Sequence, residues 1–226
     1  MARASTLITA CLVVSASFTT HAAFVTPSGW LRPSTVGEAA STATTYQQWN
    51  ILSSTTGPNA PDVASINPAG TANLIDSAAP ASGSFVTGGG NLYSFGGVIV
   101  PRITIPQSGD VAPGGTQVLL QFKVIGAAMA TDQLLVNGIS ASNLADYSYQ
   151  LLSSVPVSGG FGGATEEHAW FFTVPGHPSV ITIDVNTGFS SVSLDVVSVD
   201  TAVIVPEPMG APLLGICLPL LARRKR

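Results

Sequence analysis

Three consecutive side chains are the strongest candidates for acid–base chemistry in this sequence. Glu166, Glu167 and His168 place two carboxylates beside an imidazole, and these are groups that enzymes use to transfer protons. On a β-strand, neighbouring side chains point to opposite faces, so Glu166 and Glu167 cannot flank one glycosidic bond, whereas Glu166 and His168 share a face. We therefore interpret the cluster as a solvated strand end before the apolar stretch 169–174 and assign no catalytic pair.

A second group of residues has the chemistry of a sugar-binding site. Tyr147 and Tyr149 lie two positions apart, so both project from one face if the segment is a strand, and Asp146 lies beside them. Aromatic rings stack on the apolar side of a pyranose, and carboxylates bind its hydroxyl groups. These three residues are candidates for ligand binding; the alternative is that each large aromatic residue fills the core of the fold. Further aromatic candidates are Trp30, Tyr46 and Trp49.

Sequence motifs of known catalytic sites are absent. The sequence has no His-Glu-x-x-His, no Gly-x-Ser-x-Gly, no P-loop and no dinucleotide-binding glycine pattern. Besides His168, the only histidine after residue 24 is His177, which stands between a glycine and a proline, so we expect it in a solvated turn. We therefore expect no enzymatic activity, no cofactor and no dedicated metal site, although the scattered Asp side chains leave calcium binding open.

The composition excludes several kinds of partner. Residues 24–204 carry three basic and eleven acidic side chains, a net charge of −8. So few cations cannot neutralise a row of phosphates, which excludes nucleic acid and argues against an anionic membrane surface. Charged residues make up 9% of the chain against about 25% in typical soluble proteins, so uncharged polar residues must form the surface. Cys11 and Cys217 lie outside residues 24–204, which excludes disulfides and thiol chemistry there.

Apolar and polar residues alternate with a period of two in several segments of residues 99–203. These segments are 118–124, 170–174, 181–185 and 192–199, and the pattern predicts β-strands with one buried face. In the last segment the apolar phase slips from Val196 to Val197, which predicts a β-bulge or a strand buried on both sides. The segment 99–105 contains Pro101, which predicts an edge strand or a bulge.

Turn residues separate the predicted strands. Turn signals lie at residues 88–91 (Gly-Gly-Gly-Asn), at Asn137-Gly138, at 174–176 (Val-Pro-Gly) and at 186–188 (Asn-Thr-Gly). No segment between the two ends of the chain has a sustained helical period. We therefore predict an all-β fold, an antiparallel β-sandwich of jelly-roll type, over residues 46–204. Residues 24–45 are predicted to be a loosely ordered lead-in or a short edge strand.

The first 23 residues are predicted to be a signal peptide. Arg3 supplies a short basic region, residues 7–18 are apolar, and Ala22 and Ala23 offer a small-residue cleavage site. An N-terminal membrane anchor is the alternative, but this apolar run is well short of the roughly 20 residues that span a bilayer. Lipidation of Cys11 is rejected because almost no apolar region would precede it.

Residues 205–226 combine three features in a defined order. The first is a short motif, Val205, Pro206, Glu207 and Pro208. An apolar run over residues 209–222 follows, and the chain then continues with a basic cluster, Arg223, Arg224, Lys225 and Arg226. The apolar run favours hydrocarbon, and the cations resist crossing a membrane. A helix of this run covers about 21 Å of a hydrocarbon core that is roughly 30 Å thick, so the alternative is a short C-terminal hydrophobic segment that packs on the domain.

This order resembles the PEP-CTERM sorting signal of exported bacterial proteins. The resemblance is limited to residues 205–226, where Pro206, Glu207 and Pro208 match the core motif and Val205 precedes it. It implies that the segment inserts transiently into the inner membrane, that an exosortase cuts near the motif, and that the protein continues to the cell surface or the extracellular matrix. Two prolines around one carboxylate favour an extended peptide, which a processing enzyme can grip.

These features predict an exported β-sandwich with a structural or adhesive role in an extracellular matrix. The alternative is a carbohydrate-binding module that recognises an exopolysaccharide. The two differ in the folded protein, because sugar binding requires two or more exposed aromatic rings along a groove or a sheet face. A structural role instead buries the aromatic rings and leaves Ser, Thr and Asn on the surface.

Overall fold

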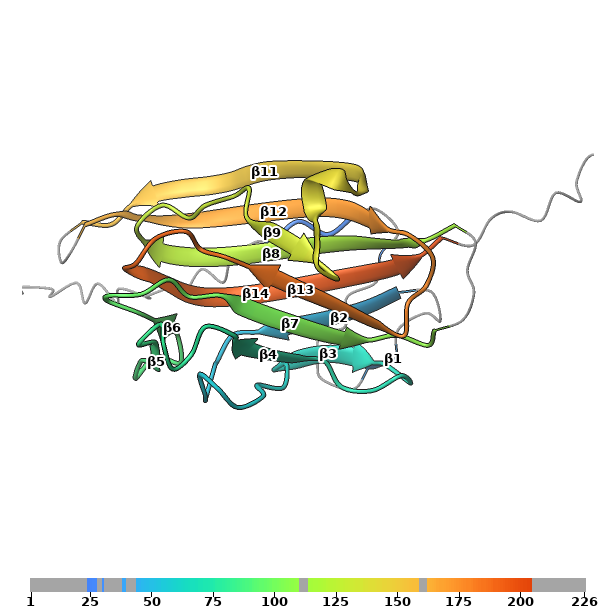
Figure 1. Cartoon of the computed structure of the whole chain (residues 1–226), viewed down its shortest axis with the longest axis horizontal. Coiled ribbons are helices and arrows are strands. Elements are labelled where there is room, and N and C mark those ends of the chain that lie inside the picture. The colour runs from blue at the N-terminus through green and yellow to red at the C-terminus, as the bar shows by residue number, and fades with distance from the viewer. Residues whose placement is uncertain are drawn as a thin grey trace, which may run out of the picture.

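Two β-sheets pack face to face in this protein (Figure 1). The computed structural model describes residues 24–27, 30, 38–39, 44–109, 114–158 and 162–204. The strands pair antiparallel, except for a two-residue parallel pairing between β1 (Glu38–Ala39) and β3 (Val63–Ile66). The predicted all-β antiparallel sandwich is therefore confirmed.

The large sheet contains nine strands and the small sheet five. The large sheet runs in the order β1, β3, β2 (Thr44–Trp49), β14 (Val192–Val203), β8 (Thr116–Gly126), β12 (Ala164–Val174) and β11 (Ala145–Pro156). The hairpin of β5 (Phe85–Val86) and β6 (Leu92–Tyr93) joins this sheet through β14. The small sheet runs in the order β10 (Ile139–Ser140), β9 (Leu134–Val136), β13 (Val180–Val185), β7 (Pro101–Pro106) and β4 (Asn73–Asp76), and one 3-10 turn, η1 (Ala141–Asn143), follows β10.

The strand order is that of a jelly roll. Eight strands in chain order, β2, β7, β8, β9, β10, β12, β13 and β14, can be numbered one to eight. The large sheet then contains the order 1-8-3-6 and the small sheet 2-7-4-5, as in two interlocked Greek keys. The remaining strands extend the edges of this arrangement, and β11 is the longest of them.

The core lies between the sheets and is formed by the predicted strand faces. Trp170 and Phe172 of β12 and Ile183 of β13 are fully buried, and Phe122 of β8 lies edge-on to Trp170 with ring centroids 5.7 Å apart. Burying such side chains contributes about 1.5–3 kcal/mol each, which makes this layer the main source of stability. The alternation predicted for segments 170–174 and 181–185 is confirmed.

The outer face of β8 differs from the prediction. The alternation in segment 118–124 predicts one buried face, but Gln121 on the other face is also fully buried because residues near the start of the described chain cover it. The backbone N–H of Val25 donates to Gln121 Oε1 at 2.7 Å, and Gln121 Nε2 donates to the Val25 carbonyl at 3.0 Å. Beside this contact the ring of Trp30 lies 6.4 Å from that of Phe171.

A β-bulge interrupts β14 just before the predicted slip of the apolar phase from Val196 to Val197. The pairing between β14 and β8 shifts register between Leu194 and Val196, so Asp195 is the extra residue. Its carboxylate lies 2.7 Å from Lys123 Nζ. After the bulge the strand is buried on both sides as far as Ala202, so both features that the phase slip predicted occur in one strand.

Pro101 does not mark a sheet edge. β7 lies between β13 and β4, and Pro101 is its first residue, paired with Asp76. Proline is tolerated at the start of a strand because the missing N–H interrupts no ladder beyond that point. The prediction of an edge strand or a bulge for segment 99–105 is therefore wrong.

The predicted turns occur where strands connect. Asn137 and Gly138 join β9 to β10 with φ of 49° and 79°, the left-handed pair that a type I′ hairpin turn requires. Residues 88–91 close the β5–β6 hairpin, and the turns at 174–176 and 186–188 carry the chain from one sheet to the other. Strand β2 begins at Thr44, and the short strand β1 lies within residues 24–45.

The predicted signal peptide and sorting signal lie outside the described residues. This applies to Ala22 and Ala23, to the motif at 205–208 and to the basic cluster at 223–226. Within the described ranges, the structure contains no helix of the length and apolarity that crossing a bilayer requires.

Candidate functional site

The pairing of β11 with β12 brings several predicted residues together at one edge of the large sheet. Tyr149 pairs directly with Trp170, and Trp170 faces the core, so the Tyr149 ring also lies on the core side of the sheet. His168 precedes Trp170 on the same face of β12, and Glu166 precedes His168. These four side chains form what we call the edge cluster.

Three rings of the edge cluster stack on one another. The ring centroids of Tyr149 and His168 are 6.1 Å apart at 24°, and those of His168 and Trp170 are 5.8 Å apart at 22°. The Tyr149 and Trp170 centroids are 5.4 Å apart. The indole Nε1–H donates to the carbonyl of Thr131 at 3.1 Å, which fixes the orientation of Trp170.

Polar contacts run through the same rings. The Tyr149 hydroxyl and His168 Nδ1 are 3.0 Å apart, and His168 Nε2 lies 3.4 Å from Glu166 Oε2. Glu166 Oε1 accepts a hydrogen bond from Ser154 Oγ at 3.2 Å. The carboxylate beside Nε2 favours the tautomer of the neutral ring that has its proton on Nε2, and in that tautomer Nδ1 accepts from the Tyr149 hydroxyl.

The structure confirms one prediction about the Glu166-Glu167-His168 cluster and corrects another. Glu166 and His168 share a face, as the strand geometry predicted. The interpretation as a solvated strand end is wrong for His168, whose side chain is only 2% exposed. The rings of Tyr149 and Trp170 cover it, and Tyr149 belongs to a strand that lies some twenty residues earlier in the sequence.

Burial shifts the pKa values of two side chains in the edge cluster. It lowers the pKa of His168, although the neighbouring Glu166 carboxylate acts in the opposite direction. Burial also raises the pKa of Tyr149, and the charges of Glu166 and Tyr147 add to this effect. Both rings are therefore neutral near pH 7. With 37% of its side chain exposed, Tyr149 is the part of the cluster that a ligand would contact first.

The three predicted ligand-binding residues do not form one site. Asp146 adopts a φ of 58° in a β-bulge between Ala145 and Ser148, and it accepts a hydrogen bond from Thr173 Oγ1 at 2.7 Å. Thr173 points away from the core face, so this carboxylate is separated from the tyrosine rings. Tyr147 is half-buried and packs against the core.

Protonation of His168 is expected to lower the stability of the fold. Its pKa in the folded state lies below the unfolded value of about 6.5, so the unfolded chain binds more protons when the pH falls through that value. The free energy of unfolding should therefore decrease from pH 7.5 to pH 5.5, and His168→Gln should reduce this decrease. Denaturant unfolding of both proteins at several pH values measures the difference, since the carboxylates common to both cancel. Equal pH slopes would contradict the assignment.

The other candidate residues named from the sequence form contacts within the fold. Trp49 lies in the core between the sheets, and its Nε1 donates to the Asn59 carbonyl at 2.8 Å. Tyr46 is also buried, but on the other face of the large sheet, where it aligns with Asp200. His177 is half-buried rather than solvated. Its Nε2 lies 2.9 Å from Ser108 Oγ and its Nδ1 lies 3.0 Å from Thr116 Oγ1, so it links the loop after β7 to the start of β8.

An aromatic cluster on the β5–β6 hairpin was not predicted. The rings of Phe85 and Phe95 stack with centroids 5.8 Å apart, and Tyr93 lies edge-on to Phe95 at 4.7 Å. Phe85 is 41% exposed and Phe95 is 60% exposed. Two features of the sequence could have indicated this cluster. Tyr93 and Phe95 lie two positions apart after a glycine-rich turn, and residues 77–101 contain no charged residue. We call these three rings the hairpin aromatic cluster.

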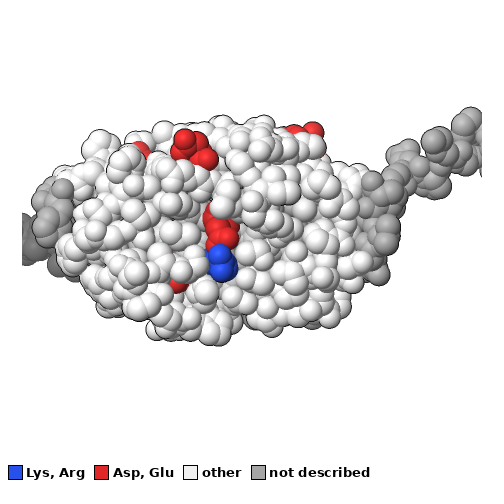
Figure 2. All heavy atoms as spheres, viewed as in Figure 1, with Lys and Arg blue, Asp and Glu red and all other residues white. Residues whose placement is uncertain are grey.

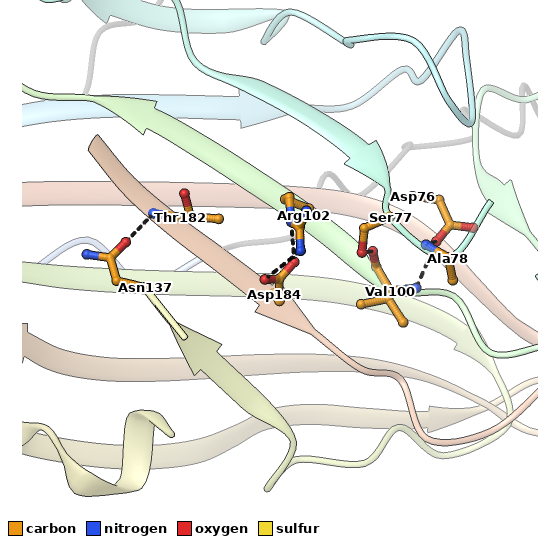
Figure 3. Close-up of polar contacts among 8 residues, drawn as sticks. All are labelled: Asp76, Ser77, Ala78, Val100, Arg102, Asn137, Thr182 and Asp184. Atoms are coloured by element: carbon orange, nitrogen blue, oxygen red, sulfur yellow. Dashed lines mark hydrogen bonds and ion pairs between the residues drawn. The ribbon is translucent and has the colours of Figure 1, made fainter. Parts of the chain in front are cut away.

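A buried carboxylate, Asp76, was also missed. Its Oδ2 accepts hydrogen bonds from Ser82 Oγ and Ser84 Oγ, both at 2.6 Å. Its Oδ1 accepts from the backbone N–H groups of Ala78 at 3.0 Å and Val100 at 2.9 Å (Figure 3). This carboxylate therefore holds the loop after β4 against the chain that enters β7. Nothing in the local sequence indicated this role.

The outer face of the small sheet carries little charge. Figure 2 shows this face almost without coloured atoms, with basic and acidic atoms adjacent near its centre. On the small sheet Arg102 Nε lies 2.7 Å from Asp184 Oδ1 across the β7–β13 pairing, a hydrogen bond that raises the pKa of Arg102 (Figure 3). Nearby, the Thr182 N–H donates to Asn137 Oδ1 at 2.8 Å. This face therefore resembles the uncharged polar surface that the composition predicted.

The described part of the chain holds no group of three His, Cys, Asp or Glu side chains arranged to bind a metal ion. No family model, no curated protein and no solved structure matches the chain. The fold itself defines the class to which the domain belongs, an all-β sandwich with jelly-roll strand order.

Proposed function

We propose that this protein is an exported component of the cell surface or extracellular matrix with a structural or adhesive role. In this proposal it is sorted through residues 205–226 by an exosortase-type processing enzyme, after transient insertion into the inner membrane. The observation that carries the proposal is the succession of Val205-Pro206-Glu207-Pro208, an apolar run and a basic cluster directly after the folded domain. The predicted signal peptide at residues 1–23 supports export.

The end of the domain suits processing at this motif. Strand β14 ends at Val203, and the N–H of Ile204 donates to the Gly115 carbonyl at 2.9 Å. The motif begins with the next residue, so a cut there would leave intact all fourteen strands that the structure describes. Pro206 and Pro208 favour an extended peptide, the form that a processing enzyme binds.

The domain also suits a structural or adhesive role. Its largest fully buried side chains are aromatic and lie in the core: Trp49, Trp170, Phe122 and Phe172. Its outer faces are poor in charge, and residues 24–204 contain no cysteine. Without cysteine the domain needs no reducing environment, which supports a role outside the cell.

Changing the motif should block processing. The triple variant Pro206→Ala, Glu207→Gln and Pro208→Ala is expected to accumulate with residues 209–226 attached, whereas Pro212→Ala, which alters a proline of the apolar run, should be processed normally. Intact mass spectrometry of protein recovered from the cell envelope and the medium measures this directly. The native protein should lack the signal peptide and everything after the motif. A native mass that still includes Arg223 to Arg226 would overturn the sorting proposal.

Carbohydrate binding is a second candidate, and the hairpin aromatic cluster favours it. Phe85 and Phe95 expose ring surface on a hairpin that has no charged side chain, and this suits a neutral polysaccharide. The tyrosines of β11 support this candidate less, because Tyr147 and Tyr149 face the core side of the sheet.

Phe95→Ala tests this candidate against a matched control. If the cluster binds polysaccharide, the variant should lose most of the retardation of the protein in a polysaccharide affinity gel. Phe189→Ala should keep that retardation, because Phe189 is 57% exposed, close to the 60% of Phe95, but lies outside the cluster. Native protein that migrates unchanged in every gel would reject the candidate.

A further inference from the structure

Strand β11 forms a long outer edge of the large sheet. It contains twelve residues and pairs with β12 on one side, and within the described part of the chain no strand pairs with its other side. Figure 1 shows it along the upper border of the sandwich. Most of its side chains are exposed, including Leu151 at 45%, Val155 at 60% and Tyr149 at 37%.

Charged side chains give this edge little protection against pairing with another strand. Proteins usually block long edges with lysine, proline, inward-pointing charges or bulges. The sequence of β11 contains no lysine and a single charged residue, Asp146, which is bound to Thr173 at one end of the strand. Its proline is the last residue, and the two bulges lie on either side of a regular stretch from Ser148 to Leu151.

The other described edges are too short to match it. The opposite edge of the large sheet is β1, with two residues, and the edges of the small sheet are β10 and β4, with two and four residues. A strand of equal length is therefore available in a second copy of β11. Two identical strands can pair antiparallel about a two-fold axis, and such an interface is self-complementary.

The distribution of charge also favours a second copy of this protein as the partner. Residues 24–204 carry a net charge of −8, so two copies repel each other over most of their surfaces. Along β11 from Tyr147 to Pro156 there is no charged side chain, so two copies can meet there without opposing carboxylates. We propose that the protein forms a symmetric dimer in which the β11 strands of two copies pair and join the two large sheets into one. This inference does not depend on the sorting signal.

Two leucines of nearly equal exposure provide the test. Leu151→Lys places a cation on the proposed interface of each copy, and it should raise the dimer dissociation constant at least about tenfold, because like charges that face each other across an interface cost several kcal/mol. Leu135→Lys should leave the dimer unchanged, since Leu135 is 43% exposed but lies on β9 in the small sheet. Sedimentation equilibrium of the full chain, in a density-matched neutral detergent that keeps its apolar ends apart, measures the constant. Circular dichroism verifies that each variant is folded.

A cross-linking measurement covers the case in which Leu151→Lys fails to fold. In a Cys11→Ala, Cys217→Ala background, Gln150→Cys on β11 should give a covalent dimer with a short bismaleimide, and Ile139→Cys on β10 should not. A native protein that stays monomeric at its highest soluble concentration would overturn the proposal. Equal weakening by the two lysine variants, or equal cross-linking at the two cysteine positions, would also overturn it.

Discussion

Trp170→Ala is expected to lower the free energy of unfolding by about 3–5 kcal/mol. The indole is fully buried, lies edge-on to Phe122 and stacks on His168, so its removal leaves a cavity where the two sheets meet. The variant also removes the hydrogen bond to the Thr131 carbonyl, which holds the chain that leads into β9. One effect removes a fully buried side chain and the other loosens the chain before β9, so we expect the loss to be among the largest for any single side chain.

Urea unfolding followed by circular dichroism measures this loss. Trp170→Phe should cost less than Trp170→Ala, because a ring still fills part of the space although the Thr131 carbonyl loses its donor. Phe189→Ala serves as a surface control and should change the stability by less than about 0.5 kcal/mol. If Trp170→Ala lowered the free energy of unfolding as little as this control does, the indole would not be part of a packed core.

Asp76→Ala is expected to destabilise the fold by about 3 kcal/mol, because four donors lose a buried acceptor. Two of these donors are the backbone N–H groups of Ala78 and Val100, which cannot rotate toward another acceptor. The loop after β4 would then separate from the start of β7, so we also expect faster proteolysis in this loop.

Asp76→Asn is the matched variant. Its Oδ1 can still accept from Ala78 and Val100, and the hydroxyls of Ser82 and Ser84 can turn to accept from the new amide. We therefore expect a loss of about 1 kcal/mol, the usual net value of a hydrogen bond. Thermal unfolding of the two variants at one pH, with limited proteolysis, compares them. Equal losses for Asn and Ala would mean that the charge, rather than the set of acceptors, holds the loop.

Much of the fold could be predicted because its signals are local. Alternation with a period of two identified β12 and β13, and the phase slip after Val196 indicated a bulge in β14, which lies just before Val196. The pair Asn137-Gly138 predicted a tight hairpin because both positions require a positive φ. Each of these features depends on neighbouring residues alone, so one sequence is sufficient to find it.

Features that depend on distant residues could not be predicted. Gln121 is buried because Val25, 96 positions earlier, lies on it, and no periodicity carries that information. Pro101 begins an interior strand because β4 pairs on its outer side. The same applies to the candidate site. That Glu166 and His168 share a face follows from strand geometry, but the burial of His168 depends on Tyr149 in the neighbouring strand.

The last strand of the domain in the sequence is also its middle strand. β14 lies between β2 and β8, so it joins the two halves of the large sheet. Until residues 192–203 have been synthesised, each half presents a bare inner edge and the core cannot close. Folding must therefore wait until nearly the whole domain has left the ribosome, and pairings this remote in sequence form slowly. In the export that we propose, this delay would keep the chain unfolded until its passage through a narrow membrane pore is almost complete.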